Sequence, residues 1–152
     1  MNEIERLAAI EEIRLLKAKY WRGVDSCDGE LVHSILAEDC ELDCRGCCTD
    51  PTSGVDFLPE MNVVMRGRDS WTGAKALAGY VTSHQGHQAE IEITGPDTAK
   101  AIWTFTDRFF YPPGSKYSRF TGYGYYHDTY TKDADGWKLQ SMRFTRLWVE
   151  AA

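Results

Sequence analysis

The chain has no long hydrophobic run and no segment rich in Lys and Arg, and both absences limit what it can do. No apolar stretch approaches the roughly 20 residues of a membrane-spanning helix. The first five residues, Met-Asn-Glu-Ile-Glu, lack the apolar core of a secretory signal. We therefore expect a cytoplasmic protein without membrane contact. Lys and Arg number 17 against 23 Asp and Glu, so the net charge is −6 and nucleic acid is not an expected partner.

Several catalytic motifs are also missing. There is no Gly-x-Ser-x-Gly nucleophile elbow, no phosphate-binding loop and no Rossmann glycine fingerprint. The cysteines number five and contain one C-x-x-C pair, Cys44 and Cys47, whereas a structural zinc site commonly needs two such pairs. We expect no metal site and interpret the cysteines as reduced thiols. A metal or redox role for them is the minority alternative.

What is present indicates one α+β domain over residues 1–152. Apolar residues at steps of three and four predict a helix over 3–27, a short helix follows through residue 37, and a third helix is expected from 69 or 70 to 81. A short strand is possible at 40–44, and 45–62 reads as a long loop. Alternating patterns then predict four strands joined by short turns, which favours antiparallel pairing. These four strands span residues 83–94, 97–112, 117–132 and 137–149.

Two histidines, His84 and His87, lie at the head of the strand predicted for 83–94. Imidazole can accept a proton near neutral pH, since its unperturbed pKa is about 6.5. Strand parity alone favours His87, which shares a face with the apolar Ile91. A β-bulge at Gly86 would shift the register and turn His84 inward instead.

Asp25 lies near the end of the first helix, where a carboxylate opposes the helix dipole. This small misfit favours a specific partner for Asp25. Tyr20 lies on the apolar stripe of the same helix and is interpreted as a core residue whose hydroxyl reaches a polar group. His33 and His127 are interpreted as structural or exposed.

Strand parity also places an acid and a base on apolar faces. Asp107 shares its face with Trp103 and Phe105, and Arg146 shares its face with Phe144. Because a lone buried charge is costly, each of these groups needs a partner or solvent. A structural ion pair is slightly favoured over a polar patch in a cavity. The inward set predicted for 137–149 includes Met142, Phe144, Arg146 and Trp148.

At many separated positions the chain resembles the SnoaL-like branch of the NTF2-like superfamily, and within it the bile acid 7α-dehydratases. The resemblance is carried by Lys19 to Asp25, Ser83 to His87, Glu90-Ile91, Thr98-Ala99, Trp103, Asp107-Arg108, Tyr126, Asp128, Tyr130, Gly136-Trp137 and Arg146. It implies a cone-shaped NTF2-like barrel, in which a curved antiparallel sheet wraps three helices of the N-terminal half around a deep pocket. The thiol-bearing loop at 44–62 does not match this family.

The resemblance also assigns a site. The catalytic set that it implies is Tyr20, Asp25, His84, Asp107 and Arg146. We expect the substrate-binding set to consist of aromatic residues of the predicted strands, namely Trp103, Phe105, Tyr125, Tyr126 and Phe144. The resemblance thereby prefers His84 over His87 and implies the bulge. The pairing of Asp25 with His84 resembles the dyad of hexachlorocyclohexane dehydrochlorinases and is similar in logic to that of scytalone dehydratases.

These residues lead to a hypothesis of a cofactor-independent lyase that acts on a small apolar carbonyl compound, such as a steroid-like or terpenoid-like ketone. His84 would be the base, oriented by Asp25. One alternative is an isomerase or polyketide cyclase that uses the same residues. Another is a non-catalytic assembly module that resembles the small subunit of ring-hydroxylating dioxygenases. The resemblance favours a homo-oligomer, with a trimer ahead of a dimer.

Overall fold

The computed structural model describes residues 1–71 and 77–152, which form two α-helices and one six-stranded sheet. The helices are α1 (Glu3–Asp25) and α2 (Gly29–Ile35), and the strands are β1 (Leu36–Asp43), β2 (Val64–Arg66), β3 (Val81–Gly95), β4 (Thr98–Phe110), β5 (Arg119–Asp133) and β6 (Gly136–Ala151). The predicted α+β class is confirmed. The four predicted strands begin and end within two residues of β3 to β6.

Helix α1 is defined by its caps and by one buried stripe. Asn2 and Glu5 form a capping box at its start, each side chain bonding the backbone N–H of the other. The helix ends at Asp25, slightly before the predicted end at 27, and Asp28 caps the restart into α2 by accepting a bond from the N–H of Leu31. The buried stripe comprises Ala9, Ile13, Leu16, Lys17, Tyr20, Trp21 and Val24.

The sheet has the order β2-β1-β6-β5-β4-β3. Strands β3 to β6 form the predicted antiparallel meander, because each is joined to the next by a short turn. The prediction of a wholly antiparallel sheet is wrong at one place, since β1 pairs parallel to β6. The chain enters β1 directly from α2 and reaches β6 only after β2 to β5, so no hairpin forces β1 and β6 to run in opposite directions.

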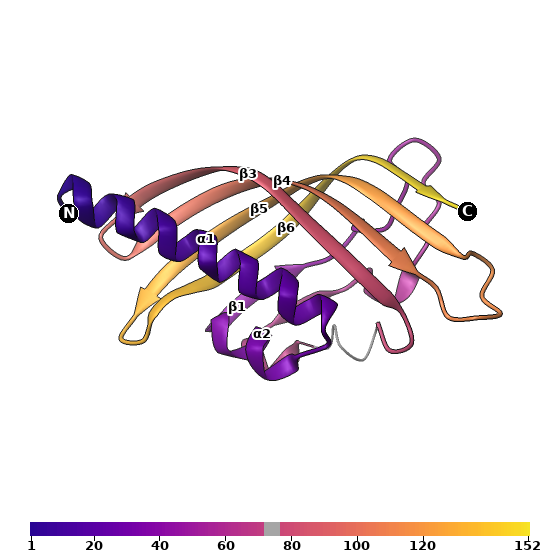
Figure 1. Cartoon of the computed structure of the whole chain (residues 1–152), viewed down its shortest axis with the longest axis horizontal. Coiled ribbons are helices and arrows are strands. Elements are labelled where there is room, and N and C mark those ends of the chain that lie inside the picture. The colour runs from indigo at the N-terminus through magenta and orange to yellow at the C-terminus, as the bar shows by residue number, and fades with distance from the viewer. Residues whose placement is uncertain (72–76) are drawn as a thin grey trace.

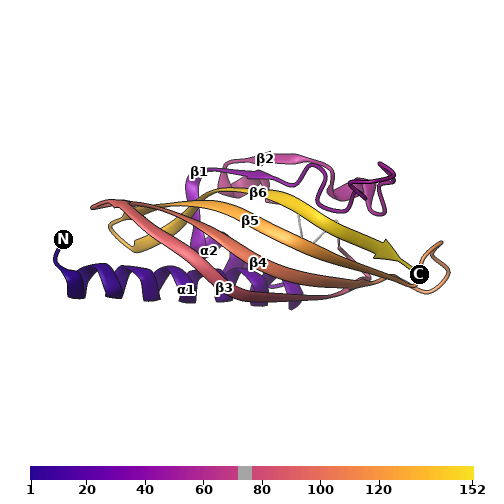
Figure 2. The ribbon, with the colours of Figure 1, turned by 90° about the horizontal axis from the view of Figure 1, so that it is seen from above.

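The sheet is curved but not closed, and α1 lies along one face of it (Figures 1 and 2). Helix α2 follows at the end of α1, beside β1 (Figure 1). Of the predicted third helix, residues 68–70 form a 3₁₀ turn and Val81 already belongs to β3, while 72–76 lie outside the described residues. The described part of the sheet therefore wraps two helices.

Two register shifts decide which side chains face α1. In β3 the ladder shifts between Gly86 and Ala89, so the bulge that turns His84 inward is present. A second shift lies between Tyr123 and Gly124 of β5, opposite β6. After this shift the predicted inward set of β6 is wrong at Trp148, which is 54% exposed.

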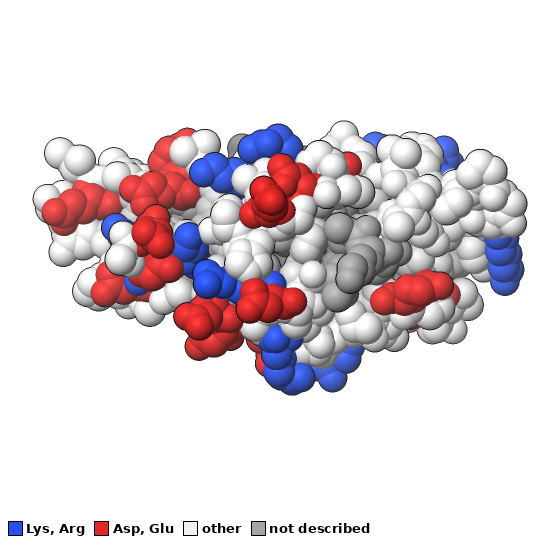
Figure 3. Space-filling view, turned by 90° about the horizontal axis from the view of Figure 1, so that it is seen from below, with Lys and Arg blue, Asp and Glu red and all other residues white. Residues whose placement is uncertain are grey.

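The long loop between β1 and β2 packs against the core. Three of its cysteines, Cys44, Cys47 and Cys48, are buried. On the face shown in Figure 3, acidic and basic side chains are interspersed. Within the described residues, no helix is long and apolar enough to cross a membrane.

Candidate active site

The end of α1 meets the beginning of β3 in a carboxylate–imidazole pair. Asp25 Oδ1 lies 2.6 Å from His84 Nδ1, although the two residues are 59 positions apart in the chain. The side chain of His84 is 7% exposed and that of Asp25 is 26% exposed. The pair is therefore shielded on the imidazole side and reachable by water on the carboxylate side.

Two further bonds hold Asp25 in place. Its Oδ2 accepts a bond from the backbone N–H of His84 at 2.9 Å, and its Oδ1 accepts one from the hydroxyl of Thr82 at 2.9 Å. An ionised carboxylate only accepts hydrogen bonds, so Nδ1 of His84 carries the proton in the neutral ring. The other nitrogen, Nε2, is then left with a free lone pair, as a general base requires.

Facing Nε2 is a second acid, which is already paired. Asp107 Oδ2 lies 4.0 Å from His84 Nε2, and the guanidinium of Arg146 binds both oxygens of Asp107 at 2.8 and 2.7 Å. Desolvation by burial would lower the pKa of Arg146, but its attraction and hydrogen bonds to Asp107 outweigh burial and raise that pKa. Arg146 also donates from Nε to the carbonyl of Cys47. The structure thus brings together the predicted Asp25, His84, Asp107 and Arg146.

Two tyrosines border the same space. Tyr20 and Tyr126 are buried and pack edge to face, with ring centroids 6.3 Å apart. Burial raises the pKa of both phenols well above its usual value, with a smaller contribution from Cys44 at Tyr20 and from Tyr20 at Tyr126. Both hydroxyls therefore stay protonated near neutral pH and can donate hydrogen bonds.

These groups surround a small space, which we name the inner cavity. Its lining includes Tyr20, Val24, Cys44, Cys47, Met61, Met65, Trp71, Leu77, His84, Asp107, Phe109, Tyr126, Phe144 and Arg146. Its free volume is about 30 Å³, whereas ligand pockets commonly measure about 300–1,000 Å³. The expectation of a deep open pocket is therefore wrong for this state of the molecule. Side chains of the β1–β2 loop and of α1 contribute part of this lining.

The predicted substrate-binding set divides into three groups. Tyr126 and Phe144 line the inner cavity. Trp103 and Phe105 do not line it, because they are buried behind the lining, where the Arg146 guanidinium stacks 4.8 Å from the Phe105 ring. The expectation for Tyr125 is wrong, because odd-numbered residues of this part of β5 point to the face away from α1.

The other three histidines lie away from the inner cavity. His87 contacts Thr106 Oγ1 at 3.3 Å on the exposed side of the bulge. The ring of His127 bonds the hydroxyl of Thr145. At His33 the partner is Asp69, at 2.8 Å on the surface. None of the three is paired with a buried carboxylate in the described part of the chain, and so His84 is the histidine with the geometry of a base.

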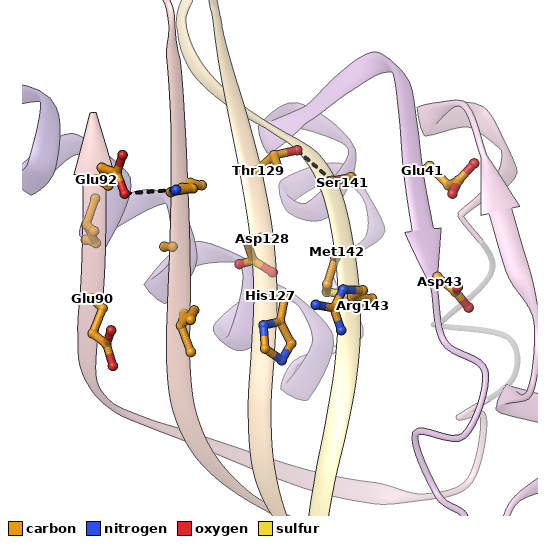
Figure 4. Close-up of a pocket in the computed structure, with 14 residues that line it drawn as sticks. Glu41, Asp43, Glu90, Glu92, His127, Asp128, Thr129, Ser141, Met142 and Arg143 are labelled. Atoms are coloured by element: carbon orange, nitrogen blue, oxygen red, sulfur yellow. Dashed lines mark hydrogen bonds and ion pairs between the residues drawn. The ribbon is translucent and has the colours of Figure 1, made fainter. Parts of the chain in front are cut away.

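A larger hollow of about 620 Å³ lies on the other face of the sheet, with the helices behind it (Figure 4). Its lining includes His127 and Arg143, and also Glu92, which forms an ion pair with Lys100 at 2.9 Å. Burial lowers the pKa of His127, and the positive charge of Arg143 adds a smaller contribution in the same direction. This hollow contains no carboxylate–imidazole pair of the kind formed by Asp25 and His84, and we do not assign the active site to it.

A buried ion pair that was not predicted from the sequence lies next to the site. Lys17 Nζ lies 2.7 Å from Asp128 Oδ2, and both side chains are fully buried. Tyr130 also donates to Asp128, and the Lys17 ammonium lies 3.7 Å from the centroid of the Tyr126 ring. Strand parity could have indicated that Asp128 is buried and needs a partner, because Asp128 shares its strand face with Tyr126 and Tyr130.

The cysteines carry no such pairing. All five are free thiols, and burial raises the pKa of the Cys44 thiol far above its usual range. Sγ of Cys47 lies 3.7 Å from Sγ of Cys48. Among residues 1–71 and 77–152, no group of histidine, cysteine and acidic side chains has the arrangement of a metal site.

Comparison with known proteins agrees with this fold. A family model described as a SnoaL-like domain matches residues 5–143. The relative "Probable cyclase FGR4" of Gibberella zeae is 32% identical over 151 residues, which covers 90% of this chain and 89% of that protein.

Solved structures show the same architecture at lower identity. The hexachlorocyclohexane dehydrochlorinase LinA-type3 from Novosphingobium barchaimii is 18% identical, with a TM-score of 0.73 over 99% of this chain and 94% of that one. The "Putative Scytalone Dehydratase" from Novosphingobium aromaticivorans is 21% identical, with a TM-score of 0.71 over 98% of this chain and 89% of that one. The chain therefore belongs to the SnoaL-like family, and its fold is that of the NTF2-like proteins.

Proposed function

We propose that the protein is a cofactor-independent enzyme that removes a proton from a carbon acid, with His84 as the general base. The observation that carries this proposal is the Asp25–His84 pair, in which Nδ1 is bonded to the carboxylate and Nε2 lies on the side of the inner cavity. A base held in this way typically contributes about 10²–10⁴-fold to a rate. Binding and electrostatic stabilisation supply the remainder.

The step begins at a C–H bond next to a carbonyl group. Nε2 of His84 takes the proton, and the electron pair of the C–H bond stays on the substrate as an enolate. The imidazolium formed is stabilised by Asp25, which is held by Thr82 and by the backbone N–H of His84. In an elimination, the enolate then expels a leaving group at the next carbon, and the Nε2 proton can follow that group.

Hydrogen-bond donors next to His84 support the developing negative charge. Tyr20 keeps its phenolic proton because burial raises its pKa, so it can donate to the enolate or to the leaving oxygen. The Arg146–Asp107 pair lies next to Nε2, on the opposite side of the imidazole from Asp25, and positions polar groups of the substrate. These donors are preorganised in a space shielded from water, where such interactions stabilise charge most strongly.

The lining of the inner cavity favours a small, neutral and largely apolar substrate. Its polar groups belong to Tyr20, His84, Asp107, Tyr126 and Arg146, and the remainder of the lining is mostly aliphatic, aromatic or thiol. A volume of about 30 Å³ holds a water molecule but no carbon skeleton of several rings. Substrate entry therefore requires side chains to move, and the unbranched Met61 and Met65 are the most adaptable of the lining.

Elimination is the first proposal, and cyclisation is the second. The dehydrochlorinase and the scytalone dehydratase share the fold with this chain, and their names describe eliminations. Cyclisation is favoured by a different observation, the 32% identity to a protein named as a cyclase. Both reactions begin with the same proton removal. The mass of the product separates them, since elimination of water lowers it and cyclisation by isomerisation preserves it.

The test is turnover of a panel of β-hydroxy ketones and linear polyketide-like ketones by the wild-type chain and two histidine variants. His84→Gln is expected to lower kcat by about 10²–10⁴-fold, as for loss of a positioned base. His87→Gln is the matched control and should keep both activity and melting temperature. Equal activity in all three proteins would contradict the assignment of the base. No turnover of any compound, together with co-purification with a larger oxygenase chain, would favour the assembly role.

A further inference from the structure

His84 lies between two spaces, and the linings of these two spaces have no other residue in common. One is the inner cavity. The other is a shallow depression of about 480 Å³ that opens to solvent beside the end of α1, which we name the helix-side depression. Its lining consists of Ala18, Trp21, Arg22, Asp25, Ser26 and His84. Among the described residues, His84 is the one that lines both spaces.

The two ring nitrogens of His84 face different spaces. Nε2 lies 4.0 Å from Asp107, which lines the inner cavity. Nδ1 lies 2.6 Å from Asp25, which lines the helix-side depression and is 26% exposed. A proton can therefore reach the imidazole from the substrate on one side and from water on the other.

We propose that Asp25 and the helix-side depression form a proton port, through which His84 exchanges protons with bulk water while the inner cavity stays closed. This inference deepens the proposed function and rests on it for its catalytic meaning. The Nδ1 proton moves to Asp25 Oδ1 and from there to a water molecule in the depression. The reverse transfer returns a solvent proton to Nδ1, while Nε2 gives its own proton to the leaving group. The charge of the ring is thus reset without water entering the cavity.

The size of the two spaces supports this route. The inner cavity of about 30 Å³ has room for about one water molecule, and a substrate would displace it. The helix-side depression is open, and the carboxylate on its floor forms a hydrogen bond to the ring. A carboxylate with an exposed edge can pass a proton to solvent, whereas the buried Asp107 is held by Arg146 on both oxygens.

The port can be tested without a substrate by measuring how fast the Nδ1 proton of His84 exchanges with water. Nitrogen-15 labelling of the histidines and NMR give this rate, and His84→Gln identifies the signal among the four histidines. Ala18 is exposed and lines the depression, so Ala18→Trp should cover it and slow exchange by about tenfold, as expected when access of water limits exchange. Arg22→Ala should widen the depression and speed exchange.

Ala8→Trp is the matched control, since it makes the same change on the exposed side of α1 away from the depression. It should leave the exchange rate as in the wild type. Equal rates in Ala18→Trp and Ala8→Trp would overturn the port, as would a rate that responds to filling of the inner cavity by Cys47→Leu but not to Ala18→Trp. Absence of turnover with the expected exchange rates would instead count against the proposed reaction and leave the port standing.

Discussion

At the scale of single residues, the Lys17–Asp128 pair shows how the core carries charge. Both side chains are fully buried, so neither charge is solvated by water. Desolvation lowers the pKa of Lys17, while the charge of Asp128 and the hydrogen bond to it act in the opposite direction. The Asp128 carboxylate receives a further bond from Tyr130 at 2.7 Å. The pair is tolerated because each charge compensates the other.

Removal of one partner should therefore cost more than removal of both. We expect Lys17→Met to lower the free energy of unfolding by about 3–5 kcal/mol, because Asp128 is left charged and buried. The double variant Lys17→Met with Asp128→Leu should recover much of this loss, since it leaves no unpaired charge. Urea unfolding of the single and double variants measures the coupling. A double variant that is less stable than Lys17→Met would contradict this account.

Gly122 provides the space for the Asp107–Arg146 pair. A Cβ atom at this position would overlap Arg146 Nη1 and would lie 2.5 Å from Asp107 Oδ1. Gly122→Ala should therefore displace the ion pair, lower stability by about 1–3 kcal/mol as overpacking does, and reduce turnover. Gly29→Ala is the matched control, because its Cβ would meet Trp71 at an ordinary distance of 3.7 Å. Equal effects of the two substitutions on thermal unfolding and on kcat would show that Gly122 has no special role.

At the scale of the elements, the bulge in β3 decides which histidine becomes the base. Gly86 faces α1 at this point, and a Cβ atom there would overlap the ring of Trp21. The Trp21 ring also packs against Trp103, with centroids 5.5 Å apart, so it has little freedom to move. Glycine at this position allows α1 and β3 to approach closely enough for Asp25 to reach His84.

We expect Gly86→Ala to lower stability by about 1–3 kcal/mol and to weaken the Asp25–His84 contact, because α1 must move away from β3. Trp21→Leu should partly rescue it, since a smaller side chain leaves room for the new methyl group. A double-mutant cycle on thermal stability, with the His84 imidazole followed by NMR, measures the coupling. Additive effects of the two substitutions would mean that the overlap does not set the helix–strand distance.

The sequence predicted the meander well because local signals define it. Short turns of Gly, Pro and Asp separate four alternating runs, and strand parity correctly placed Asp107 among buried residues. The unfavourable position of Asp25 at a helix C-terminus correctly indicated a partner. The bulge in β3 was an open alternative, because parity alone favoured His87 and only the family resemblance favoured His84.

Features that depend on long-range packing were not predicted. The parallel pairing of β1 with β6 joins segments that are far apart in the chain, such as Leu36 with Leu139, and no local pattern specifies it. The shift at Gly124 reverses the parity of β6 and exposes Trp148, which periodicity alone places inside. The volume of the inner cavity depends on how the β1–β2 loop packs, and composition carries no information on this.

At the scale of the whole molecule, the two faces of the sheet differ in character. The face toward α1 carries the core and the candidate active site. The opposite face exposes several large apolar side chains, and we name four of them, exposed by 38–65%, the outer apolar patch. Its members form two pairs of ladder neighbours near one end of the meander, Val81 with Phe110 and Tyr123 with Trp148. Apolar side chains exposed together in this way are typical of contact surfaces between proteins.

We expect the outer apolar patch to be covered by a second copy of the chain, so that the protein is a homo-oligomer. Arg108 and Glu150 carry opposite charges and lie in the row between the two apolar pairs, and neither forms an ion pair within the described residues, so two copies can offer each other complementary charges. Light scattering should give a multiple of the 17.3 kDa chain, with a trimer as the form that the family resemblance favours. Trp148→Glu should shift the protein toward the monomer because it places a charge in the patch, whereas Leu15→Glu on the exposed side of α1 should not. A wild-type protein that is monomeric at all concentrations would show that this face is free in solution.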